Sequence, residues 1–144
     1  MNAETESHFV STDPALLDVD FICAALAGSY WARDRPRDLI ERSVARSLCF
    51  GLYEKPGRRQ VGFARVVTDG ATFSWLCDVV VDERHRRRGL GKFLVSCVVG
   101  HPDVRATQCL LGTRDAHGLY ERFGFRRAKM MRRPRDAAAP AGPP

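Results

Sequence analysis

Residues 81–95 read VDERHRRRGLGKFLV and combine five basic side chains, two glycines and an apolar run in one short segment. From Gly89 onward, apolar residues recur at i, i+3, i+4, i+7 and i+8, which predicts an amphipathic helix that ends near Gly100. The apolar, β-branched residues before this segment predict a strand over 70–82. The chain is therefore expected to form a strand, a loop and a helix in that order.

The start of this helix has the properties of an anion-binding site. The first backbone N–H groups of a helix lack partners, and that end carries a partial positive charge. Gly89 and Gly91 allow an anion to approach the backbone closely. The basic residues around the turn are Arg86, Arg87, Arg88 and Lys92. Together these features predict a pyrophosphate site.

Two common phosphate-binding patterns do not match this loop. A P-loop needs Ser or Thr after its Gly-Lys pair, but Phe93 follows Lys92. The dinucleotide fingerprint needs a third glycine, where Leu94 stands. The pyrophosphate site is therefore expected to belong to another class.

The composition limits the class of protein. The chain has 144 residues, 44% of them apolar and 28% charged, which fits one globular domain. Its net charge of +6 attracts anions such as nucleic acids, membranes or phosphorylated small molecules. Nucleic acid is not favoured, because no aromatic residue for base stacking stands among the basic residues of 84–92. No apolar run is long enough to span a membrane, and the acidic, polar start does not resemble a secretion signal.

The cysteines and histidines do not predict a metal site. The five cysteines are widely spaced and form no CxxC pair, so buried free thiols in a reducing compartment are expected. Ligands clustered as zinc requires are absent from the sequence. His8 and His85 are expected at the surface or in loops.

Hydrophobic periodicity predicts the other elements. Helices are expected over 18–28, 37–48 and 115–123, and strands over 9–14, 49–54, 60–69, 105–113 and 125–133. The order β-α-α-β-β-β-α-β-α-β predicts an α/β (α+β) fold with a mixed, mostly antiparallel sheet and helices on its faces. One domain is expected over 1–133, followed by a disordered Pro/Ala-rich tail over 134–144.

Two segments resemble the GNAT superfamily of N-acetyltransferases. The stretch RRRGLG (86–91) matches the Q/R-x-x-G-x-G/A signature of that family. The stretch DAHGLYERFGF (115–125) is similar to its A-x-x-x-Y-x-x-x-G-F segment. The likeness covers about 9–127, is best over 72–125, and points to a small, single-domain bacterial-type member.

The resemblance implies a sheet whose middle strands splay apart around acetyl-CoA. The pantetheine arm would pair with the strand, and the loop amides would hold the pyrophosphate. The implied cofactor-binding residues are Val79, Val80, Val81, Arg86, Arg87, Arg88, Gly89, Leu90, Gly91, Lys92 and Thr113. Many members carry Asn at the position of Thr113, so the amide contact is lost here. Tyr120 would stand beside the sulfur and protonate the leaving thiolate.

Asp78 is a candidate for the general base, or for a group that binds the substrate ammonium. It is the one acid inside an apolar strand, and strict alternation places it on one face with Leu76 and Val80. A carboxylate held partly out of water gains basicity. A salt bridge to a nearby arginine is an equal alternative for Asp78. His117 and Asp115 are second candidates for the base.

Three residues after the first helix are candidates for binding the acceptor. Tyr30, Trp31 and Arg33 would form an aromatic wall, or would meet an anionic part of the substrate. Aromatic packing beneath the two N-terminal helices is the alternative for Tyr30 and Trp31.

The resemblance implies an acetyl-CoA-dependent N-acetyltransferase in the cytoplasm. Its acceptor is predicted to be a primary amine of a small molecule, which attacks the thioester directly. Two alternatives are a peptide or protein amine, and an acyl-CoA-binding sensor without catalysis. Retention of Tyr120 argues against the sensor. A homodimer is left open, because many relatives form dimers.

Overall fold

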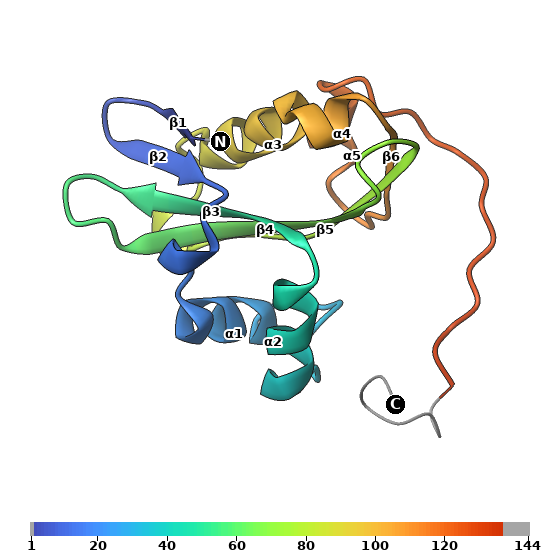
Figure 1. Cartoon of the computed structure of the whole chain (residues 1–144), viewed down its shortest axis with the longest axis horizontal. Coiled ribbons are helices and arrows are strands. Elements are labelled where there is room, and N and C mark those ends of the chain that lie inside the picture. Colours follow the sequence, from blue (N-terminus) through green and yellow to red (C-terminus); the bar gives the residue numbers. More distant parts are fainter. Residues whose placement is uncertain (1, 137–144) are drawn as a thin grey trace.

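The computed structural model describes residues 2–136 and contains one six-stranded sheet with helices on both faces (Figure 1). The strands lie in sequence order: β1 (Asn2–Glu4), β2 (His8–Ser11), β3 (Leu48–Glu54), β4 (Gln60–Thr68), β5 (Phe73–Val81) and β6 (Gln108–Leu111). Neighbouring strands are antiparallel, except that β5 and β6 run parallel. The predicted fold class, a mixed and mostly antiparallel sheet, is confirmed.

The helices form two layers that bury separate cores. On one face lie α1 (Val19–Ala27) and α2 (Arg37–Ala45), and on the other lie α3 (Leu90–Gly100) and α4 (Pro102–Arg105) (Figure 1). A short helix, α5 (His117–Glu121), follows β6. The periodicity of α3 is confirmed, since Leu90, Leu94, Val95, Cys97 and Val98 are its buried residues.

Several elements differ from the sequence prediction. The strand β1, the helix α4 and two 3-10 helices, Pro14–Leu16 and Glu83–His85, were not expected. The strand predicted over 125–133 is wrong, because residues 122–136 form no strand. Five of its nine residues are basic, so the segment has little apolar surface to bury against a sheet. Of the predicted disordered tail, residues 137–144 lie outside the described residues.

A β-bulge interrupts β5 at Asp78. Phe63 of β4 pairs with Val80, and Arg65 pairs with Cys77, so two residues of β5 face one residue of β4. Asp78 itself takes the left-handed conformation, with φ 54°. The bulge places Leu76 in the core beneath α3 and Val80 in the core beneath α1 and α2. The predicted strict alternation is therefore wrong at this point of the strand.

The parallel pairing of β5 with β6 is short. It joins Phe73–Leu76 to Gln108–Leu111, in register from Phe73 opposite Gln108 to Leu76 opposite Leu111. Beyond Leu76, β5 has no strand partner on its β6 side among residues 2–136. The two strands therefore separate at the bulge, as the splayed strands of the resemblance implied.

Candidate active site

The unpaired edge of β5 leads directly into a loop that is open to anions. The loop turns through the 3-10 helix Glu83–His85 and through two left-handed residues, Arg87 (φ 65°) and Gly89 (φ 75°). Gly89 is also the N-cap of α3 and, having no side chain, supplies no cap. The first backbone hydrogen bond of the helix runs from the Phe93 amide to the Gly89 carbonyl, 3.1 Å.

Six consecutive amides in this loop are available to a ligand. Within residues 2–136, the backbone N–H groups of 87–92 donate to no protein acceptor. A Cβ atom built on Gly89 or Gly91 would meet nothing within 4 Å, so space remains in front of the backbone. Unpaired amides at a helix N-terminus with free space before them fit a pyrophosphate group.

The basic side chains around the loop differ in their contacts. Arg86 turns back and donates from Nε to the carbonyl of Val81, 3.1 Å away. Arg87, Arg88 and Lys92 are exposed. Arg86 thus fixes the loop to the end of β5, while the other three leave positive charge at the surface.

Two buried histidines support the loop from below, which the sequence prediction missed. His8 is 2% exposed and His85 is 7% exposed, so the expectation of surface positions is wrong. His85 Nε2 lies 3.2 Å from Glu54 Oε2, and its ring packs edge-on against His8. Burial, together with the nearby Arg88 and His85, lowers the pKa of His8. Isolated histidines give no periodic signal, so the sequence did not reveal this support.

Tyr120 lies in the wall of a cavity. The cavity has a volume of about 730 Å³ and lies between β6, α5 and the segment after it, with Thr113 also in its wall. The Tyr120 ring packs edge-on against Phe125, with ring centres 5.8 Å apart. Burial raises the pKa of Tyr120 to about 12, and Tyr30 and Asp115 add to the rise. Tyr120 therefore keeps its proton at neutral pH.

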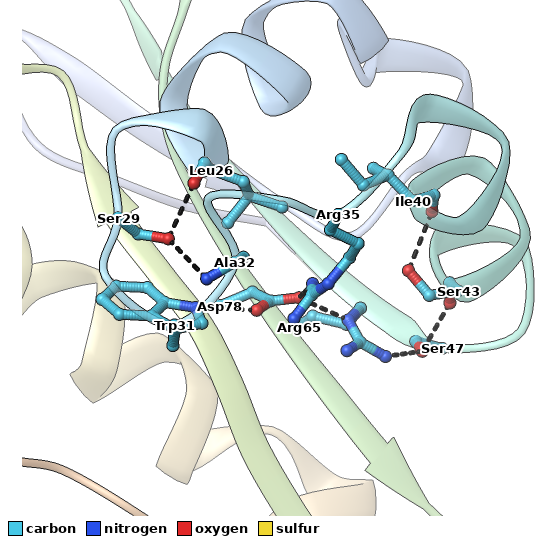
Figure 2. A network of polar contacts seen from close by, with 10 residues as sticks. All are labelled: Leu26, Ser29, Trp31, Ala32, Arg35, Ile40, Ser43, Ser47, Arg65 and Asp78. Carbon is cyan, nitrogen blue, oxygen red and sulfur yellow. Dashed lines mark hydrogen bonds and ion pairs between the residues drawn. The ribbon is translucent and has the colours of Figure 1, made fainter. Parts of the chain in front are cut away.

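Asp78 is the centre of a buried polar network (Figure 2). Its Oδ2 accepts hydrogen bonds from Arg35 Nη1 and Arg65 Nε, each 2.8 Å, and its Oδ1 accepts one from Trp31 Nε1, 3.0 Å. The side chain is 2% exposed. Arg65 extends the network by donating from Nη1 to Ser47 Oγ, 3.1 Å. The network joins the α1–α2 connection to the bulge of β5.

The contacts of this network determine the direction in which the pKa of Asp78 is shifted. Burial alone would raise the pKa of Asp78, but Arg65 and Arg35 outweigh burial and lower it. A carboxylate with a lowered pKa and three donors is a poor proton acceptor. The expected gain in basicity is therefore wrong, and the salt-bridge alternative is what the structure contains. Asp78 Oδ1 accepts one hydrogen bond and Oδ2 accepts two, so binding of the substrate ammonium by Asp78 stays a prediction.

The predicted acceptor wall lies next to this network. Tyr30 and Trp31 are 41% and 43% exposed, so they do not pack beneath the helices. Their rings meet edge-on, with centres 5.1 Å apart. The Arg114 guanidinium stacks 3.7 Å above the Tyr30 ring, and the Arg114 amide donates to the Tyr30 hydroxyl, 3.2 Å. These contacts join the α1–α2 connection to the loop after β6, across the gap between β5 and β6.

The remaining predicted residues have different positions. Thr113 Oγ1 accepts a hydrogen bond from the Ala116 amide, 3.0 Å, and so holds the turn before α5. Arg33 is exposed, as is Asp115, while His117 lines the cavity beside Tyr120. The structure thus brings Tyr30, Trp31 and Asp78 together, and it places the loop 86–92 at the other end of the β5 edge.

Metal and thiol chemistry find little support among the described residues. Residues 2–136 contain no group of three or more His, Cys, Asp or Glu side chains that could hold a metal ion. All five cysteines are free; Cys49 and Cys97 are buried, and the other three are half-buried rather than fully buried as predicted. Burial raises the pKa of Cys77, the thiol nearest Asp78 in sequence, to about 11. In the same residues, no helix is both long and apolar enough to cross a membrane.

Comparison with known proteins finds one family. The model of the acetyltransferase (GNAT) domain matches residues 45–127. A Gibberella zeae protein named as a candidate acetyltransferase is 35% identical over 141 residues, which cover 83% of this chain and 79% of that protein.

Two solved structures illustrate the range of similarity. A candidate GNAT-family acetyltransferase from Xanthomonas campestris pv. campestris is 43% identical, with a TM-score of 0.84 over 90% of this chain and 94% of that chain. Glucosamine-6-phosphate N-acetyltransferase from Arabidopsis thaliana is 16% identical, with a TM-score of 0.64 over 90% of this chain and 99% of that chain. The second likeness concerns the fold alone.

Proposed function

The chain belongs to the GNAT acetyltransferase family, and from this premise we propose that it transfers the acetyl group of acetyl-CoA to a primary amine of a small molecule. The observation that carries the proposal is the unpaired edge of β5 together with the six free amides of 87–92 that follow it in the chain. An extended arm that ends in a pyrophosphate matches this surface in shape and in hydrogen-bonding groups.

The residues that would hold acetyl-CoA follow from this surface. The backbone of Val79, Val80 and Val81 offers the strand edge for the pantetheine arm. The loop amides, with Gly89, Leu90 and Gly91 between the charged Arg86–Arg88 and Lys92, would hold the pyrophosphate. Thr113, across the gap, is the weakest member of the set, because its hydroxyl already accepts the Ala116 amide.

When bound, acetyl-CoA supplies a thioester carbonyl that an amine can attack. The amine nitrogen bonds to the acetyl carbon and loses a proton, while the carbon–sulfur bond breaks and the sulfur gains a proton. Tyr120 is our candidate for the donor of that second proton. Its hydroxyl is protonated at neutral pH, and it lies in the wall of the cavity that Thr113 also lines.

The proposed acceptor is a small molecule, because the predicted wall of Tyr30, Trp31 and Arg33 borders a cavity of about 280 Å³. A cavity of this volume suits a small ligand better than a folded partner. Two alternatives remain as outcomes of the test: a peptide or protein amine, and binding of acyl-CoA without turnover. The cytoplasmic location and the homodimer stay predictions.

The test is a panel of small primary amines and a lysine-containing peptide, with thiol release measured in the presence of acetyl-CoA. We expect turnover with a small amine, and a fall in kcat of about 10²- to 10⁴-fold in Tyr120→Phe with the affinity for coenzyme A retained. Tyr53→Phe is the matched control, because the Tyr53 hydroxyl is buried on β3 without a hydrogen-bond partner among the described residues.

Each other outcome corrects the proposal in a defined way. Turnover with the peptide alone would move the acceptor to the second class. Coenzyme A binding without turnover for any amine would favour the sensor. An unchanged rate in Tyr120→Phe would remove Tyr120 as the acid.

A further inference from the structure

The acceptor side carries more positive than negative charge. Arg35 and Arg65 share the single carboxylate of Asp78. The neighbouring cavity of about 280 Å³ is lined by Tyr30, Trp31 and Pro36, and by four charged residues: Arg33, Asp34, Arg35 and Arg135. Leaving Arg135 aside, Arg33, Arg35 and Arg65 outnumber the two carboxylates of the network and the cavity, Asp34 and Asp78.

Some guanidinium N–H groups of these arginines have no acceptor among the described residues. Arg35 donates to Asp78 through Nη1, and within residues 2–136 its Nε and Nη2 groups have no acceptor. Its side chain is 21% exposed, so it reaches the cavity from the buried network. Arg33 is exposed and forms no ion pair or side-chain hydrogen bond with any other described residue. Guanidinium groups with free donors suit carboxylate and phosphate oxygens.

Trp31 connects the cavity to the place of reaction. Its ring lines the cavity, and its indole nitrogen donates to Asp78 at the bulge, where β5 and β6 separate (Figure 2). The Trp31 ring thus lies between the cavity and the open edge of β5. A small amine bound beside Trp31 would have one end in the cavity and its nitrogen toward the gap.

From these observations we propose that the acceptor is a small amine that also carries an anionic group, a carboxylate or a phosphate, bound by Arg33 and Arg35 beside Trp31. This inference rests on the proposed acetyl transfer and adds the chemical class of the acceptor. Arg33 and Arg35 would hold the anionic group in the cavity, and the amine would point toward the gap between β5 and β6.

The same charge has a chemical consequence. An amine attacks a thioester only in its neutral form, and nearby positive charge lowers the pKa of an ammonium group. Each arginine near the bound amine therefore lowers the pKa of its ammonium form, while the anionic group of the acceptor acts in the opposite direction. In this site Asp78, the acid that contacts Trp31, accepts hydrogen bonds from three donors.

The first test uses matched acceptors that differ in the anionic group alone: aminoethyl phosphate against ethanolamine, and β-alanine against its amide. We expect kcat/KM at least about tenfold higher for one anionic member than for its neutral partner, and the better pair tells phosphate from carboxylate. Equal or better use of both neutral amines would overturn the inference while leaving acetyl transfer intact.

The second test uses Arg33→Gln, with Arg46→Gln as the matched control. Arg46 is an exposed arginine at the end of α2, away from the cavity. We expect Arg33→Gln to raise KM for the anionic acceptor about tenfold, with KM for the neutral partner unchanged. It should also move the rising limb of the pH–rate profile to higher pH, because removal of positive charge raises the pKa of the amine. Equal effects of the two variants would contradict the inference.

A third measurement needs no turnover. Inorganic phosphate is titrated into Trp75→Phe saturated with coenzyme A, which would occupy the loop 86–92, and the fluorescence of Trp31, the remaining one of the two tryptophans, is followed. We expect saturable binding that weakens in Arg33→Gln and persists in Arg46→Gln. If no amine is acetylated, the proposed function fails, and this titration still decides whether the cavity binds an anion.

Discussion

The two ends of the β5 edge present different groups: one end presents unpaired backbone amides, and the other presents side chains that are already hydrogen-bonded. At the loop 86–92 the protein leaves backbone amides unpaired and keeps side chains out of the way, with Gly89 and Gly91 at the centre. At the bulge it does the reverse: every oxygen of Asp78 is occupied, and side chains from three separate elements meet. A ligand common to a whole family can be bound by backbone, whereas the partner of one protein is chosen by side chains.

The largest effect is expected from the removal of the carboxylate of Asp78. Asp78→Ala leaves two arginines, 21% and 14% exposed, without their partner, and we expect a loss of about 3–5 kcal/mol in the free energy of unfolding. Asp78→Asn should cost less, because Asn tolerates the left-handed conformation and still accepts from Trp31. Urea unfolding measures both, and equal stability of Asp78→Ala and the wild type would contradict the ion-pair assignment.

The pH dependence of this effect has a definite sign. The pKa of Asp78 is lower in the folded state than its ordinary value of 3.8, so the ion pair stabilises the protein above that value. The stabilisation is lost as the pH falls through the folded pKa. The difference between the wild type and Asp78→Asn should therefore be constant near neutral pH and shrink below about pH 4. A difference that grows on acidification would show that Asp78 is not held as a carboxylate.

At the other end of the edge, a side chain added to Gly91 should affect binding and not folding. A Cβ atom fits there without contacts, so Gly91→Val should fold normally. We expect the Kd for coenzyme A to rise about 10- to 100-fold, equivalent to about 1.4–2.7 kcal/mol, because the side chain occupies the space in front of the amides. Calorimetry measures the change.

Gly100→Val is the matched control for this prediction. Gly100 lies in the last turn of the same helix and is equally open, with nothing within 4 Å of an added Cβ. It should leave the Kd for coenzyme A unchanged. Equal losses in both variants would mean that the helix as a whole, and not the open loop, determines the affinity.

The smallest effect is expected at Thr113, which lies between the two regions. Thr113→Val removes the acceptor of the Ala116 amide and should cost about 0.5–1.5 kcal/mol of folding stability. The Kd for coenzyme A should change less than in Gly91→Val. Thr113→Ser keeps the hydroxyl and should restore stability, as thermal unfolding would show. A larger effect on the Kd than that of Gly91→Val would give Thr113 a direct place in the site.

The sequence predicts the cofactor side better than the acceptor side for a physical reason. The glycine spacing and the onset of the apolar period at 89–98 are local, so the strand, loop and helix can be read from neighbouring residues. The network of Asp78 depends on residues from three elements, Arg35 and Arg65 being 43 and 13 positions away. Neither arginine was selected from the sequence, since pairing across elements has no local signal.

The bulge explains why the strict alternation predicted for β5 is wrong, although the strand itself is predicted correctly. The residues of 73–81 alternate well enough to predict β5, but alternation does not reveal an extra residue opposite Ala64. The bulge brings Asp78 to the side of Arg65 and moves Val80 to the opposite core from Leu76. Aspartate adopts the left-handed backbone conformation more often than most residues do, but the φ angle of Asp78 cannot be predicted from the sequence.

The separation of β5 from β6 also bears on aggregation. Unpaired strand edges act as templates for pairing with other chains, and residues 77–81, Cys-Asp-Val-Val-Val, form such an edge inside the sheet rather than at its rim. A ligand that pairs with this edge would also shield it. If coenzyme A binds along this edge as proposed, light scattering on heating should begin at lower temperature without coenzyme A than with it.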